Sequence, residues 1–149
     1  MTIDFRSSSR PGGRLIKAAA FLSISAAFIH SYVVPEHLRE WWGYGTFFIA
    51  ATVLQALYGI IILMQPWLYE RDGSLKARSA GYEKLLYLLG IFGNAAVIGL
   101  YIITRTMGMP LFGPEAGKVE PVTLIGIASK ITEVLTIVCL VHLYRKARD

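Results

Sequence analysis

The stretch of sequence that decides the fold runs from Trp41 to Tyr69 and reads WWGYGTFFIAATVLQALYGIIILMQPWLY. Its 29 residues include no Asp, Glu, Lys or Arg. An α-helix rises about 1.5 Å per residue, so roughly 20 apolar residues cross the hydrocarbon core of a bilayer. The stretch is therefore long and apolar enough to predict a membrane-spanning helix.

Three further stretches have the length and low charge of a membrane span. Ala18 to Val34 and Leu85 to Thr104 carry no formal charge, and Pro121 to Tyr144 is interrupted by Lys130 and Glu133. We predict an all-α integral membrane four-helix bundle with a short interfacial helix after the first span and a long outer loop before the fourth. A single domain, residues 1–149, would hold spans at about 15–34, 43–65, 83–104 and 122–144.

The composition of the chain agrees with a membrane protein. Of its 149 residues, 54% are hydrophobic and 17% are charged, whereas soluble domains carry about 25% charged residues. The net charge is +5, but the basic residues flank apolar blocks instead of forming a stripe on a polar face. This pattern disfavours nucleic acid as a partner and makes a lipid bilayer the expected one.

The short loops predict the orientation of the chain. Eleven Lys and Arg residues lie on the side of the two termini and three lie on the opposite side. Because cytoplasmic loops are enriched in Lys and Arg, we expect both the N-terminus and the C-terminus to be cytoplasmic. The expected location is the plasma membrane, which the chain would cross four times. An alternative for the first apolar block is a signal peptide cleaved near Ser25-Ala26-Ala27.

The first outer loop carries a candidate metal site. Pro35 suits the first turn of a short interfacial helix, on which His37 and Glu40 would share a face at i, i+3. His30 lies one or two turns earlier, and Glu115 or Glu120 could contribute from the other outer loop. The alternative is that His37 and Glu40 form a surface ion pair and that His30 is hydrogen-bonded inside the bundle.

Several polar residues fall at membrane depth when the spans are threaded in the expected direction. Glu133 lies near the middle of the fourth span, and Lys130 is one turn outward at i, i+3. His30 is placed somewhat further out, so no second titratable group is expected at the depth of this pair. The expected ligand or proton pocket comprises six residues, namely Gln55, Asn94, Tyr101, Arg105, Lys130 and Glu133. The alternative is a structural network of buried hydrogen bonds.

Small residues predict close helix packing in the first and third spans. Ala19, Ser23, Ala27 and Ser31 recur at every fourth position, and glycines and alanines recur between Gly90 and Gly99. Both spans are expected in the bundle interior, although such stripes also join subunits of a homo-oligomer or a larger membrane complex. The second outer loop contains apolar residues that need cover, so it is expected to fold back over the helix ends.

Two segments resemble a known group of proteins. Residues 35–48, PEHLREWWGYGTFF, and residues 104–117, TRTMGMPLFGPEAG, are similar to segments of small four-span prokaryotic membrane proteins with no assigned activity. The resemblance covers all four spans and implies a four-helix membrane bundle. It implies no reaction and no functional residue.

The leading functional expectation is a binding or accessory membrane subunit with an outward-facing polar pocket. Signatures of haem attachment, nucleotide phosphate binding, zinc proteases and nucleophilic triads are absent from the sequence, which disfavours a classical enzyme and leaves any cofactor open. Handling of Cu or Zn at the extracytoplasmic face and a proton-linked carrier are the alternatives.

Overall fold

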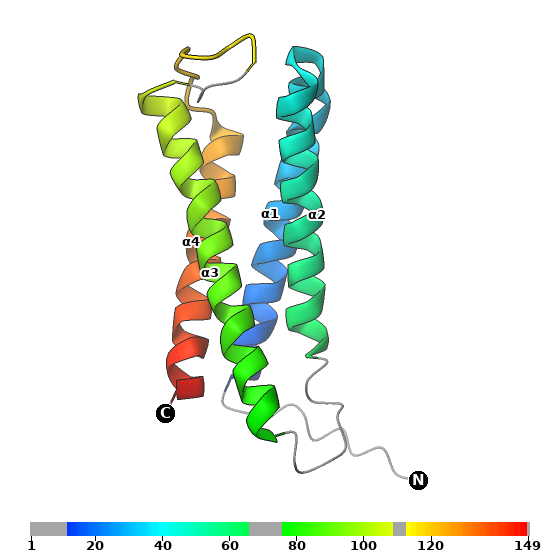
Figure 1. Ribbon diagram of the computed structural model, residues 1–149, viewed down its shortest axis with the longest axis vertical. Helices are drawn as coiled ribbons and strands as arrows, with labels where there is room; N and C mark the ends of the chain where they lie inside the picture. Colours follow the sequence, from blue (N-terminus) through cyan, green and yellow to red (C-terminus); the bar gives the residue numbers. More distant parts are fainter. Residues whose placement is uncertain (1–11, 66–75, 109–112, 149) are drawn as a thin grey trace.

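Four antiparallel helices make up the fold in a computed structural model that describes residues 12–65, 76–108 and 113–148 (Figure 1). They are α1 (Gly13–Glu40), α2 (Trp42–Met64), α3 (Lys76–Thr106) and α4 (Leu124–Arg148). The start of α1 and the end of α4 lie at one end of the bundle, here called the terminal end. The α1–α2 junction and the α3–α4 loop lie at the other, the loop end. The predicted all-α four-helix bundle is confirmed.

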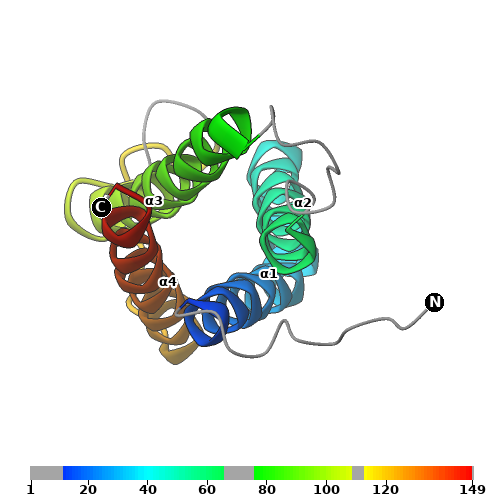
Figure 2. The ribbon, with the colours of Figure 1, turned by 90° about the horizontal axis from the view of Figure 1, so that it is seen from below.

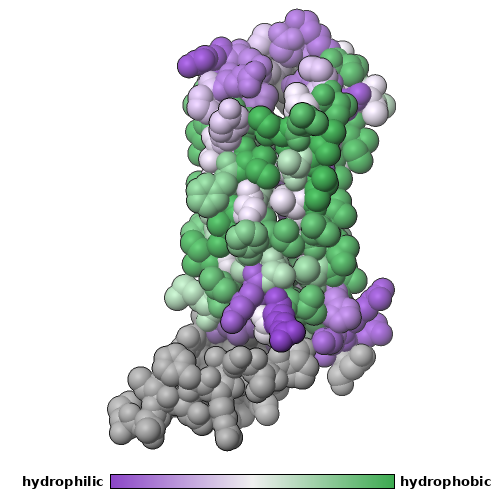
Figure 3. Space-filling model, turned by 180° about the vertical axis from the view of Figure 1, so that it is seen from behind, coloured by the Kyte–Doolittle hydropathy of each residue, from purple (hydrophilic) through white to green (hydrophobic). Residues whose placement is uncertain are grey.

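The outside of the bundle is apolar between two polar ends. All four helices are long and apolar enough to cross a membrane. A hydrophobic band separates hydrophilic caps in the space-filling view (Figure 3). Large side chains exposed on it include Phe21, Phe28, Leu54, Leu57, Leu89, Phe92 and Ile131. Apolar surface this extensive requires lipid around it, so the chain is a multi-pass membrane protein.

The expected interfacial helix is wrong as a separate element, because α1 continues through Pro35 to Glu40. Proline removes one intrahelical hydrogen bond, which a membrane helix tolerates when its surroundings compensate. Trp41 alone connects α1 to α2 in extended conformation, and its backbone N–H donates to the carbonyl of His37 at 3.0 Å. Gly45 then lets α2 approach α1, since a Cβ there would lie 2.2 Å from Cγ of Leu38.

The helices pack as a chain of neighbours around the bundle. α1 packs against α2 and α4, and α3 packs against α4, whereas α2 and α3 are not a closely packed pair. Figure 2 shows the four helices arranged as a ring in which α2 and α3 occupy adjacent places. Consequently the α2–α3 side is the least tightly packed side of the bundle.

Small residues support this packing in α1 but not throughout α3. The buried small residues of α1 are Ala19, Ala20, Ser23, Ala26 and Ala27. In α3, Gly90 is buried, whereas Gly93, Ala95 and Ala96 are exposed. The expectation is therefore confirmed for Ala19, Ser23 and Ala27 of the first span but wrong for Ser31, which is exposed, and it is wrong for most of the third span, because α3 turns a different face toward α4.

An apolar cluster fills the interior at the terminal end. It contains Ala19, Ala20, Ile62, Tyr87, Leu140 and Leu143, each at most 4% exposed. The cluster draws on all four helices, and the Tyr58 hydroxyl adds a link by donating to the carbonyl of Leu86 at 3.1 Å. The terminal half of the bundle is thus a close-packed core of apolar side chains.

Two glycines of α3 offer a matched test of this packing. A Cβ on Gly90 would lie 2.0 Å from the Tyr58 hydroxyl oxygen and 2.6 Å from Cδ1 of Leu140, whereas one on Gly93 would meet nothing within 4 Å. We expect Gly90→Ala to lower the free energy of unfolding by about 1–3 kcal/mol through overpacking. Gly93→Ala should be neutral or slightly stabilising. Thermal unfolding in detergent micelles compares the two, and equal melting temperatures would contradict the packing.

Candidate functional site

The α3–α4 loop folds back over the helix ends, as expected, in its described part. The backbone N–H of Glu115 donates to the Tyr44 hydroxyl at 3.3 Å, and that of Glu120 donates to the carbonyl of Thr104 at 3.1 Å. Gly113 adopts φ of 96° against the same tyrosine ring. Cover was expected for four apolar residues of this loop. For Met107 that expectation is wrong, since its side chain is 79% exposed, and Met109, Leu111 and Phe112 lie outside the described residues.

A cavity of about 330 Å³ lies beneath this loop, between the four helices at the loop end. Its walls are largely aromatic and aliphatic, with residues that include Ile29, Val33, Trp41, Tyr44, Phe47, Phe48, Val97 and Leu100. Its polar lining comprises His30, His37, Tyr101, Thr104, Arg105, Glu120, Thr123, Ser129 and Lys130. The volume is that of a site for a small organic molecule.

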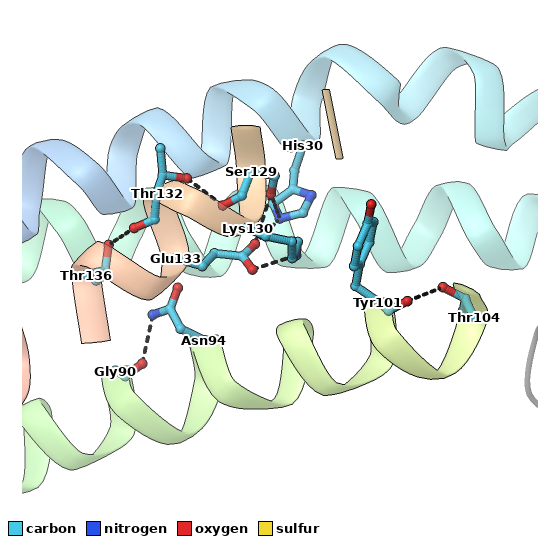
Figure 4. Close-up of polar contacts among 10 residues, drawn as sticks. All are labelled: His30, Gly90, Asn94, Tyr101, Thr104, Ser129, Lys130, Thr132, Glu133 and Thr136. Carbon is cyan, nitrogen blue, oxygen red and sulfur yellow. Dashed lines mark hydrogen bonds and ion pairs between the residues drawn. The ribbon is translucent and has the colours of Figure 1, made fainter. Parts of the chain in front are cut away.

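The Glu133 carboxylate organises the polar network at the inner end of the cavity (Figure 4). It is fully buried, and its Oε1 lies 2.9 Å from Nε2 of His30 and accepts from the Ser129 hydroxyl at 3.0 Å. Its Oε2 accepts from the Lys130 ammonium. Both oxygens are therefore satisfied, as burial of a carboxylate at membrane depth demands.

His30 takes a position that threading of the spans placed too far outward. Its ring reaches Glu133 directly and joins α1 to α4. The expectation of no second titratable group at the depth of the Lys130–Glu133 pair is therefore wrong. Because α1 packs against α4, the imidazole bridges the distance between the two helices.

Tyr101 stands between two cations on the wall of the cavity. Its ring centroid lies 4.7 Å from Cζ of Arg105 and 5.3 Å from Nζ of Lys130, which are cation–π distances. Arg105 also forms an ion pair with Glu120. The Tyr101 hydroxyl oxygen and Nε of Arg105 are buried and have no hydrogen-bond partner among the described residues.

Gln55 and Asn94 are buried but do not line the cavity. Asn94 Nδ2 donates to the carbonyl of Gly90 in its own helix at 2.7 Å, as Figure 4 shows. The side-chain amide of Gln55 has no partner in the described part of the chain, while its backbone carbonyl accepts from the Ser23 hydroxyl at 2.8 Å. Of the six residues of the expected pocket, Tyr101, Arg105 and Lys130 thus line the cavity, whereas Glu133, Gln55 and Asn94 are buried outside its lining.

The three candidate metal ligands do not gather in one place. Nδ1 of His37 lies 2.8 Å from Oε2 of Glu40, and the His37 ring stacks on Phe48 with centroids 4.3 Å apart. His30 instead contacts Glu133. Within residues 12–65, 76–108 and 113–148, no three His, Cys, Asp or Glu side chains are placed to hold a metal ion, so we do not retain metal handling as a proposal.

Sequence reasoning missed two polar members of the site. Ser129 donates to Glu133 from one turn away on α4, and its i, i+4 spacing was a usable signal. The second residue is Thr104. Its hydroxyl accepts from the Arg105 guanidinium, and its backbone carbonyl accepts from the backbone N–H of Glu120 across the loop, an arrangement that no local spacing indicates.

Comparison of the chain with protein-family models, with curated proteins and with solved structures finds no match. The resemblance to small four-span prokaryotic membrane proteins stays a prediction.

The charge balance of the Glu133 network is open to a direct test. Glu133→Gln keeps the shape of the side chain but leaves the Lys130 ammonium without its counter-charge at membrane depth. We expect it to lower the free energy of unfolding by about 3–5 kcal/mol. Adding Lys130→Met removes the isolated cation, so the double variant should be more stable than Glu133→Gln alone.

Unfolding by heat or by SDS in mixed micelles measures both variants. Glu120→Gln is the matched control, because it breaks the more exposed pair with Arg105 and should change the free energy of unfolding by about 1 kcal/mol or less. A double variant as unstable as Glu133→Gln would show that charge pairing is not what this network contributes.

Proposed function

We propose that this membrane protein is a binding protein, acting alone or as an accessory subunit, that holds a small ligand in the loop-end cavity. The observation that supports it most is the cavity itself, with apolar walls and polar groups gathered at the inner end and at one side. Ligand sites commonly have this composition, in which the apolar walls supply affinity and a few polar groups fix orientation.

The two halves of the bundle favour a binding site over a channel or carrier. The cavity occupies the loop half, and the apolar cluster around Ile62, Tyr87 and Leu140 fills the terminal half. A solute that entered the cavity would meet a close-packed core beyond Glu133. The chain also lacks the interrupted helices typical of alternating-access transporters in its described spans.

The distribution of Lys and Arg supports an outward-facing cavity in the plasma membrane. Arg14, Lys17, Arg145, Lys146 and Arg148 flank the helices at the terminal end, opposite the cavity. By the positive-inside rule this end is cytoplasmic. The loop end and its cavity then face the extracytoplasmic side.

Cysteine labelling in intact cells tests this orientation. In a Cys139→Ala background, we expect Val33→Cys, on the cavity wall, to react with a membrane-impermeant cationic methanethiosulfonate reagent. Leu140→Cys, in the apolar cluster, should stay unlabelled, and Arg148→Cys should react only after the membrane is permeabilised. Labelling of Arg148→Cys but not Val33→Cys in intact cells would overturn the outward orientation.

A cavity-filling substitution tests binding. Val97→Trp places an indole in the cavity, whereas Ile102→Trp adds the same ring to a position of α3 that is 54% exposed on the outside. With 1-aminoanthracene as the probe, native mass spectrometry should detect one bound molecule per chain for the wild type and for Ile102→Trp. We expect at least a tenfold loss of affinity in Val97→Trp, because a well-filled apolar site contributes more than 1.4 kcal/mol.

Nonspecific partition into the micelle would add probe equally to all three proteins. Equal probe binding by the wild type and Val97→Trp, with Val97→Trp folded, would overturn the proposed function.

A further inference from the structure

The fixed charges around the cavity cancel. Two cations line it, and each has its own carboxylate, since Lys130 pairs with Glu133 and Arg105 pairs with Glu120. An anionic ligand would have to displace one of these carboxylates from its cation. A cationic ligand would find both carboxylates already paired with Lys130 and Arg105. Because an unbalanced charge is costly away from water, the balance favours a neutral ligand.

The unused hydrogen-bonding capacity in the cavity wall is mainly that of donors. Nε of Arg105 is a donor only, and it is buried without a partner in the described residues. The Tyr101 hydroxyl, which can donate, is likewise buried without a partner in these residues. The Lys130 ammonium has three N–H groups, and Glu133 accepts a hydrogen bond from one of them. Buried donors without partners call for acceptor oxygens from another molecule.

The walls around these donors suit a flat ring. Tyr44, Phe48 and Tyr101 line the cavity with aromatic rings, and Trp41 and Phe47, which also line it, contact Tyr44 and Phe48. Aromatic side chains pack favourably in offset or edge-to-face contact with another ring. A neutral ring that carries carbonyl oxygens matches both the walls and the donors.

We infer that the ligand is a neutral, lipid-soluble ring compound of the quinone type, whose carbonyl oxygens accept hydrogen bonds from Tyr101 and Lys130; this rests on the proposed function. The α2–α3 side supports the same ligand class. Both helices line the cavity, yet they are not a closely packed pair. An alkyl tail attached to the ring leaves the bundle between them and lies in the surrounding lipid.

Three probes that carry the same decyl tail but differ in their rings test which ring chemistry the cavity binds. Decylubiquinone has a neutral ring with carbonyl oxygens, decylbenzene has the ring without acceptors, and 4-decylbenzoate has an anionic acceptor. Titration of the full-length protein in nanodiscs, followed by native mass spectrometry, gives the affinity of each. We expect decylubiquinone to bind most tightly, by about a hundredfold over decylbenzene, which is the effect of two buried hydrogen bonds at about tenfold each.

Tyr101→Phe removes one oxygen and keeps the ring between the two cations. It should weaken decylubiquinone binding about tenfold and leave decylbenzene binding unchanged. Tyr82→Phe is the matched control, because Tyr82 lies on the same helix, is 55% exposed and does not line the cavity. It should change neither affinity.

The outcomes separate this inference from the proposed function. Tightest binding of 4-decylbenzoate would show an anion site, and equal binding of all three probes, unaffected by Tyr101→Phe, would show an apolar cavity without donor recognition. Either result overturns the quinone-type ligand while the binding function stands. Failure of all three probes and of 1-aminoanthracene to bind would overturn both.

Discussion

The need to stabilise the Glu133 carboxylate away from water is the constraint on which the loop half of the bundle depends. A carboxylate at membrane depth needs a counter-charge and hydrogen bonds to both oxygens. Lys130 and Ser129 come from its own helix, but His30 comes from α1. The bond between His30 and Glu133 therefore fixes the height at which α1 and α4 meet. It also places the inner end of the cavity at this height.

The two halves of the bundle fill their interiors, away from water, in different ways. In the terminal half, charged groups are absent from the apolar cluster, and Ile62, Tyr87 and Leu140 pack with small residues of α1. In the loop half, charged groups are admitted and paired, and space remains between them. That space is lined by all four helices. A cavity confined to the loop end of the bundle follows from this division.

The sequence predicted the features that depend on one helix at a time. Three uncharged stretches and a fourth interrupted only by Lys130 and Glu133 predicted the number of helices, and the i, i+3 spacing of these two residues predicted their pairing. Features that depend on the relative height and rotation of two helices were missed, as with His30 against Glu133. A stripe of small residues likewise identifies a close approach without naming the partner, so Gly93 was assigned to the interior although it is exposed. Pro35 was read as a helix start, because the rule for soluble helices neglects the tolerance of membrane helices for proline.

The paired and unpaired polar groups of the cavity differ in charge, and therefore in the free-energy cost of being left without a partner. Lys130 and Arg105 are charged, and each is paired with a carboxylate of the same chain. The Tyr101 hydroxyl is neutral, so its lack of a partner among the described residues costs about 1–3 kcal/mol, a penalty that a bundle of four packed helices tolerates. The fold therefore tolerates this hydroxyl without a partner, and a ligand that accepts its hydrogen bond would recover that cost. Between two cations, the ring that bears it is held in one orientation, which is what recognition of an acceptor oxygen requires.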